Sequence, residues 1–211
     1  MAAIPHMTGL SPQQWQHGID CELEKTVGNT QVDSLRTILL FEADANQNLK
    51  KVGQDMMYQA EDLNALAQEQ FGSQKTLSSA DQSLNKRLTL DLMGQLTKPG
   101  ALCSNDAKSC YDRVVHSVAT ISMQRMGVPQ EPIVCMFTTT QNLKHCIRTY
   151  YGDSAVTFSG QLWAVLMHGL GQGNGARPPI WGVISTPVIY VLHDEGCGAF
   201  FKASISGTEL S

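Results

Sequence analysis

Long apolar runs and a strong charge of either sign are both lacking in this sequence of 211 residues. The apolar stretch from Pro178 to Leu192 is shorter than the roughly 20 residues that a membrane-spanning helix needs, and Pro187 interrupts it. Fifteen Lys and Arg against 19 Asp and Glu give a formal net charge of −4, so bulk positive charge does not predict nucleic-acid binding. The first residues lack the basic and apolar regions of a signal peptide. We expect an intracellular protein of the cytoplasm or nucleus with no membrane partner.

Paired metal-binding motifs are also lacking, because none of the six cysteines forms a Cys-x-x-Cys pair. They are interpreted as reduced thiols. A zinc site that uses His145 and Cys146 with a distant ligand is a minor alternative. His116, His145 and His168 have no second His or Glu at ligand spacing, and are interpreted as structural or exposed side chains.

Hydrophobic residues make up 42% of the chain, which is enough for a folded core. Apolar alternation predicts a hairpin over 18–41 with its turn at Gly28-Asn29. Apolar spacing predicts five helices, over 46–66, 79–96, 112–126, 131–143 and 180–192, and the last of these is expected to be buried. Further strands are expected over 144–151 and 155–159, around the turn Gly152-Asp153-Ser154, and over 162–167 and 199–205. Strands and helices do not alternate strictly, which predicts an α+β fold.

Two segments have patterns that suggest chemistry. In Asp106-Ala107-Lys108-Ser109-Cys110-Tyr111-Asp112-Arg113, a predicted strand over 101–106 delivers a carboxylate, and an aromatic follows five residues later. A carboxylate at a strand end can ligate Mg²⁺, although Asp106 as a loop acid or helix cap explains the pattern as well. The second segment has glycine at every second position from 169 to 175, which suits close contact of the backbone with a phosphate or a base.

The glycine segment also satisfies a relaxed dinucleotide-binding fingerprint, Gly171-x-Gly173-x-x-Ala176, with Asp194 about 20 residues on. A dinucleotide-binding oxidoreductase fragment is therefore a remote alternative. Too few residues follow Ala176 to supply further strand-helix-strand units.

Taken in order, these segments resemble the palm motifs of the reverse transcriptases of retrotransposons. The strings Ser-Cys-Tyr-Asp-Arg at 109–113 and Gly-Gln-Gly-Asn-Gly-Ala at 171–176 are similar to those of retrotransposon polymerases of algae and other eukaryotic microbes. Lys25 and Arg36, on either side of the Gly28-Asn29 turn, resemble the basic residues of the fingers hairpin. Glu69-Gln70-Phe71-Gly72 resembles a segment between fingers and palm.

The resemblance implies the fingers and partial palm of a right-hand polymerase, with a fingers-like region at 1–100 and a partial palm at 101–211 in one domain. It implies RNA-directed DNA synthesis, a nucleotidyl transfer on an RNA or DNA template-primer with dNTP and Mg²⁺. Asp106 would be the catalytic metal ligand, with the carbonyl of Ala107 beside it. The nucleotide would contact five residues, which are Lys25, Arg36, Tyr111, Gln172 and Gly173.

The sequence departs from the family pattern in one respect, because no Asp-Asp pair occurs in it. The family's third palm motif is an aromatic-x-Asp-Asp hairpin, and the thumb follows it. One aspartate does not hold two divalent ions, so we expect a truncated fragment that does not polymerise DNA by itself. Primer extension by the purified protein, abolished by Asp106→Ala, would contradict this expectation. A non-catalytic nucleic-acid-binding or protein-binding remnant is the alternative, and uncovered palm surface is expected to cause self-association.

Overall fold

An antiparallel hairpin forms one edge of the sheet in the computed structural model, which describes residues 3–160, 167–199, 203–205 and 208–210. Strand β1 (His17–Glu24) pairs with β2 (Leu35–Phe41), and Asp20 lies opposite Leu39. The expected hairpin over 18–41 is therefore confirmed. Its connection contains Gly28 at a positive φ of 85° and a 3-10 turn, η2 (Val32–Ser34).

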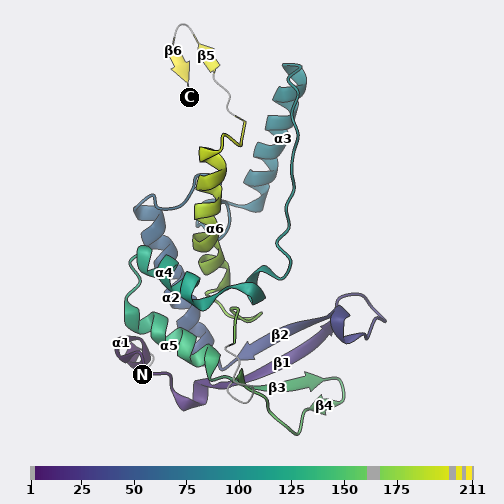
Figure 1. The fold of residues 1–211 in the computed structure, drawn as a ribbon, viewed down its shortest axis with the longest axis vertical. Coiled ribbons are helices and arrows are strands. Elements are labelled where there is room, and N and C mark those ends of the chain that lie inside the picture. The colour runs from purple at the N-terminus through teal and green to yellow at the C-terminus, as the bar shows by residue number, and fades with distance from the viewer. Residues whose placement is uncertain (1–2, 161–166, 200–202, 206–207, 211) are drawn as a thin grey trace.

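The sheet is completed by a second hairpin from much later in the chain. Strand β3 (Lys144–Thr149) runs parallel to β1, and β4 (Gly152–Asp153) folds back on it, so the strand order is β2-β1-β3-β4. In Figure 1 the two hairpins lie side by side at one end of the molecule.

The second hairpin differs from the expected one. The turn is at residues 150–151 rather than at 152–154, and 155–159 is not a strand, since only Phe158 bridges to His145. Ser154 explains the early end of the pairing. Its hydroxyl donates to the carbonyl of Val156 at 2.8 Å and accepts the N–H of Ile147 at 3.1 Å, which turns the chain away from β3.

Four helices enclose the main core: α2 (Ala43–Asp62), α4 (His116–Arg125), α5 (Gln130–Gln141) and α6 (Arg177–Asp194). The short helix α1 (Ala3–Thr8) packs on α5. The expected helices over 46–66, 112–126 and 131–143 are confirmed with shifted ends. Helix α4 starts late because residues 110–113 form a 3-10 turn, η3 (Cys110–Arg113), and it stops before Gly127, whose φ is 78°. The largest fully buried side chains of this core are Met56, Met123, Ile133, Met136, Leu170, Ile180 and Val183.

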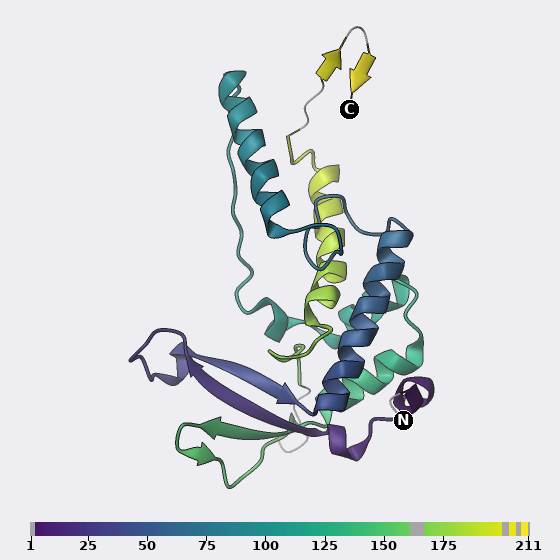
Figure 2. The same cartoon turned by 180° about the vertical axis from the view of Figure 1, so that it is seen from behind.

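Helix α3 (Ser79–Gln95) confirms the helix expected over 79–96, but its spaced apolar residues do not pack in the core. A capping box fixes its start, because Ser78 accepts the N–H of Asp81 and the Asp81 carboxylate accepts the N–H of Ser78. None of its residues is buried, and the spaced Leu84 and Leu88 are 59% and 52% exposed. The helix extends beside α6 and away from the core in both views (Figures 1 and 2).

Helix α6 was expected to be buried over 180–192, and only its first half is. Ile180, Val183 and Thr186 are buried, whereas Val188 and Val191 are about 60% exposed. Strands β5 (Ala203–Ile205) and β6 (Thr208–Leu210) form a separate small hairpin. The strand expected over 199–205 is confirmed at 203–205, and its residues 200–202 lie outside the described residues. Most of the strand expected over 162–167 lies outside the described residues.

The fold is therefore a mixed α+β arrangement with a small four-stranded sheet. The sheet and the core each combine residues from 1–100 with residues from 101–211. Strand β1 pairs with β3, and α2 packs against α6 in the main core. No helix among the described residues is long and apolar enough to cross a membrane.

Candidate functional site

A cavity of about 400 Å³ lies between the β1–β2 hairpin, the η3 turn and the loop that precedes α6. Three of the residues that the sequence analysis selected, Lys25, Arg36 and Gln172, line it together. Lys25 and Arg36 belong to the β1–β2 hairpin, and Gln172 belongs to the loop before α6. The other residues that line the cavity are Asp20, Leu35, Thr37, Leu39, Ser109, Asp112, His145, Phe158, Met167, His168 and Gly171.

The charges of this cavity favour an anionic ligand. Lys25 and Arg36 are exposed, and neither side chain forms an ion pair or hydrogen bond with another described residue. Of the two lining carboxylates, Asp20 is hydrogen-bonded to His145, and Asp112 has no such partner. The cavity is thus lined by two unpaired cationic side chains and one unpaired carboxylate, which suits a multiply charged anion such as a polyphosphate.

The loop that carries Gln172 is attached to the outer edge of β2. Leu39 donates its N–H to the carbonyl of Gln172 at 2.6 Å. Gly173 makes this approach possible, since its φ is 133° and a Cβ there would lie 2.0 Å from the carbonyl oxygen of Leu39. Gly173 therefore positions Gln172 and does not itself line the cavity.

The other glycines of the loop also meet protein rather than open space. A Cβ at Gly169 would lie 2.8 Å from the backbone of Asp112, and one at Gly175 would lie 2.7 Å from Lys50 on α2. The N–H of Gly175 is accepted by the side chain of Asn46, at 2.9 Å. Packing thus explains the alternating glycines, and the loop is not arranged here as a phosphate cradle.

An Asp–His pair at the cavity was missed by the sequence analysis. The Nδ1 of His145 on β3 lies 2.9 Å from a carboxylate oxygen of Asp20 on β1, and both side chains are more than nine-tenths buried. The ring of Phe158 stacks on the imidazole, with centroids 5.0 Å apart and planes at 16°. The parallel pairing of β1 with β3 creates this contact, and no local spacing indicates it.

Tyr111 lies next to the cavity but does not line it. The guanidinium of Arg177 lies over its ring, 3.9 Å from the centroid, and Trp181 packs edge-on at 6.0 Å. The carbonyl of Tyr111 accepts the N–H of Leu170 at 3.0 Å. These contacts place the motif at 109–113 beside residues that flank the motif at 171–176, and a cation–π contact holds the aromatic ring.

Asp106 and Ala107 do not line this cavity, and they lie on an exposed stretch without regular structure. The strand expected over 101–106 is absent, because no described strand pairs with it. Two or more carboxylates are needed to hold a pair of Mg²⁺ ions. The described residues contain no group of three His, Cys, Asp or Glu that could hold a metal. The donors around Asp106 do not fit the Mg²⁺ site that the resemblance implies, and we derive no metal-dependent step.

A second buried histidine fixes the start of the glycine loop. The Nε2 of His116 lies 2.7 Å from the carbonyl of Gly169, and its Nδ1 lies 3.2 Å from the amide nitrogen of Gln141. The ring stacks on Phe137 with centroids 4.5 Å apart. Burial lowers the pKa of His116, the hydrogen bond to Gly169 opposes this effect, and the nearby His168 adds to it. The neutral imidazole therefore holds the loop in place.

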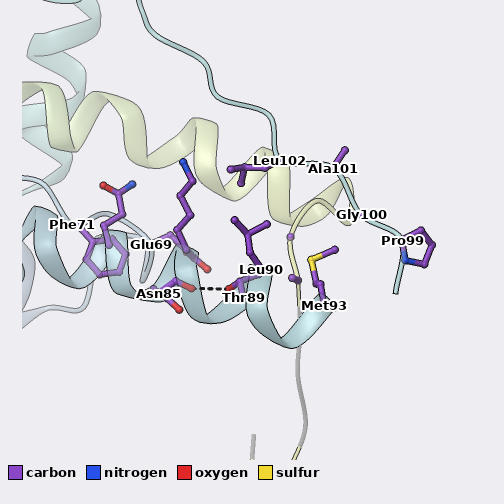
Figure 3. A pocket seen from close by; sticks show the side chains of 14 residues that line it. Glu69, Phe71, Asn85, Thr89, Leu90, Met93, Pro99, Gly100, Ala101 and Leu102 are labelled. Atoms are coloured by element: carbon purple, nitrogen blue, oxygen red, sulfur yellow. Dashed lines mark hydrogen bonds between the residues drawn. The ribbon is translucent and has the colours of Figure 1, made fainter. Parts of the chain in front are cut away.

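A second cavity, of about 530 Å³, lies between α3 and the segments 99–102 and 198–199. Figure 3 shows Leu90 and Met93 of α3 facing the stretch from Pro99 to Leu102. The hydroxyl of Thr89 forms a hydrogen bond within the helix, because it donates to the carbonyl of Asn85 at 2.9 Å. This cavity is mainly apolar. Glu69 and Phe71 of the segment 69–72 line it, but none of the residues that the resemblance assigns to the nucleotide or the metal does.

The two minor alternatives receive no support from these contacts. Asp194 ends α6, which begins at Arg177, and a helix of this length separates it from the glycine loop by about 25 Å. A ribose-binding acid has to lie close to the loop. His145, considered for zinc, is instead paired with Asp20, and Cys146 lies near Ser154.

No protein-family model and no curated protein matches this sequence.

Proposed function

We propose that this chain is the fingers and partial palm of a reverse-transcriptase domain of retrotransposon origin, and that its cavity binds a nucleoside triphosphate. The supporting observation is that Lys25, Arg36 and Gln172 line one cavity. Lys25 and Arg36 were selected from the hairpin and Gln172 from the glycine segment, and these two parts of the sequence, which lie far apart in the chain, line the same cavity.

In this proposal Lys25 and Arg36 bind the triphosphate, because they are the unpaired cationic donors of the cavity. Gln172 contacts the nucleotide beyond the phosphates, and Gly173 holds Gln172 at β2. The contact of Tyr111 with the sugar stays a prediction, because its ring is held by Arg177 next to the cavity and does not line it. The assignment of Asp106 and Ala107 to Mg²⁺ stays a prediction, and nucleotide binding by Lys25 and Arg36 does not depend on it.

Calorimetric titration with one deoxynucleoside triphosphate tests this function. We expect Lys25→Ala and Arg36→Ala each to weaken binding about tenfold, because each removes a charge-assisted contact. Arg87→Ala is the matched control, since Arg87 is exposed on α3 and pairs only with Asp91. Absence of binding by the natural chain would overturn the proposal, and so would an equal effect of Arg36→Ala and Arg87→Ala.

A template strand is the second partner that the proposal implies, and one surface feature favours it. Tyr150 and Tyr151 form the β3–β4 turn, are 99% and 96% exposed, and lie edge to face at 5.6 Å. Exposed aromatic rings at a hairpin tip can stack on unpaired bases. This observation also supports the alternative of a non-catalytic nucleic-acid-binding remnant.

Binding of a single-stranded oligonucleotide, measured over a salt series, tests this second partner. The double variant Tyr150→Ala with Tyr151→Ala should weaken binding at every salt concentration, because stacking depends little on ionic strength. The control is Tyr58→Ala, which alters an exposed tyrosine on α2 that lies under Lys75. Equal affinities for the double variant and the natural chain would remove the turn from the proposed interface.

A further inference from the structure

The Asp20–His145 pair has an unused hydrogen-bonding atom. His145 lines the cavity and is 5% exposed, and its Nε2 has no hydrogen-bond partner. The carboxylate of Asp20 is a pure acceptor when ionised, so the Nδ1 of His145 carries the hydrogen that joins them. The atom left for a ligand is Nε2. An unpaired buried polar atom is unfavourable until something binds to it.

The position of this pair relative to the cations indicates which part of a ligand it meets. Arg36 lies opposite Leu23 in the β1–β2 ladder, and Leu39 lies opposite Asp20 three residues further along. At about 3.3 Å per residue, the two rows are about 10 Å apart. Residues three apart on a strand have their side chains on opposite faces, so Arg36 lines the cavity from the edge strand β2 and not from the face that carries Asp20 and His145. A ligand that spans both rows carries its anionic group at Lys25 and Arg36 and a hydrogen-bonding group at His145.

We propose that the Nε2 of His145 hydrogen-bonds a sugar hydroxyl of the nucleoside triphosphate whose phosphates contact Lys25 and Arg36. Asp20 is the positioning residue, since it fixes the orientation of the imidazole and the ring nitrogen that carries hydrogen. A hydroxyl both donates and accepts, so it satisfies Nε2 in either protonation state of the ring. This inference rests on the proposed function and extends it, because it predicts that the cavity recognises a nucleoside and not a polyphosphate alone.

Comparing two probes separates this role from a structural one. A deoxynucleoside triphosphate and inorganic tripolyphosphate are titrated into the natural chain and into His145→Phe. We expect His145→Phe to weaken nucleotide binding about tenfold and to leave tripolyphosphate binding unchanged. Arg36→Ala should weaken both. His193→Phe is the matched control, since His193 on α6 pairs with Glu69 and does not line the cavity.

Two further variants test the arrangement. Asp20→Asn keeps the side-chain size and should weaken only nucleotide binding, by a smaller factor than His145→Phe. His145→Gln restores a polar group and should recover part of the lost affinity, which a purely structural role would not produce. Far-UV circular dichroism checks the fold of each variant.

The results that overturn the inference are distinct. Equal loss of both probes in His145→Phe means that the histidine only supports the fold, and no loss of either means that Nε2 does not touch the ligand. If the natural chain binds neither probe, the proposed function fails as well. If it binds tripolyphosphate and nucleotide equally, only the nucleoside contact at His145 fails.

Discussion

Leu39 donates its backbone N–H to the carbonyl of Gln172 across 2.6 Å, and this bond joins the edge of the sheet to the loop before α6. Because Leu39 lies three residues after Arg36 on β2, the bond fixes Gln172 at the cavity that Arg36 lines. The geometry of the candidate site therefore depends on a backbone contact that only the glycine at 173 allows.

Replacement of Gly173 by alanine should lower the free energy of unfolding by about 3 kcal/mol. The added Cβ would lie 2.0 Å from the carbonyl oxygen of Leu39, and the φ of 133° is strained for any residue with a Cβ. Urea denaturation measures the change. Gly94→Ala is the control, because Gly94 lies in α3 with nothing near its Cβ position, and it should stabilise the helix by about 0.5–1 kcal/mol. Equal effects of the two substitutions would contradict the packing role of Gly173.

Two apolar residues of α6 should respond differently to truncation. Ile180→Ala removes a fully buried side chain from the main core and should cost about 2–5 kcal/mol. Val191→Ala on the same helix should change stability by less than about 0.5 kcal/mol, because Val191 is 59% exposed. Chemical denaturation at one pH compares them. A large loss for Val191→Ala would show that the second half of α6 is covered in solution.

Stability should fall as the pH drops below about 6.5, in part because of His116. Burial lowers the pKa of His116 in the folded chain, so the unfolded chain binds the proton more readily. The stabilising effect of the neutral ring is thus fully present above the unfolded pKa of about 6.5 and is lost as the pH falls toward the folded pKa. His6, whose pKa is also lowered by burial, acts in the same direction.

Urea midpoints between pH 7.5 and 5.0 measure this effect. In His116→Gln the decline should be shallower than in the natural chain, while His193→Gln serves as the control for a partly buried histidine on the surface that pairs with Glu69. The same slope in His116→Gln and the natural chain would assign the pH dependence to other groups.

The exposed leucines of α3 should promote self-association. Leu84 and Leu88 follow one another at helical spacing, and both are more than half exposed. The double variant Leu84→Glu with Leu88→Glu should shift the sedimentation profile toward the monomer and leave the urea midpoint unchanged, since neither side chain is packed. Gln82→Glu, on the same helix, adds charge without removing apolar surface. An unchanged profile in the double variant would place any association elsewhere.

The sequence predicted the elements whose signals are local. The hairpin over 18–41 follows from alternation and a turn, α3 follows from helical spacing and composition, and the end of α4 follows from Gly127. Burial was less predictable, because apolar residues at helical spacing occur both in α3, which is unpacked, and in α2, which is packed. Apolar spacing shows which residues share one face of a helix, but it does not show what packs against that face.

The cationic part of the candidate site was also selected from sequence, through the motifs that contain Lys25, Arg36 and Gln172. Only the tertiary structure decided that Asp20 and His145 belong to it. These two residues lie 125 positions apart, and the parallel register of β1 with β3 brings them together. Contacts of this kind depend on pairing between strands that are far apart in the sequence, whereas local periodicity concerns only residues that are near one another in the chain.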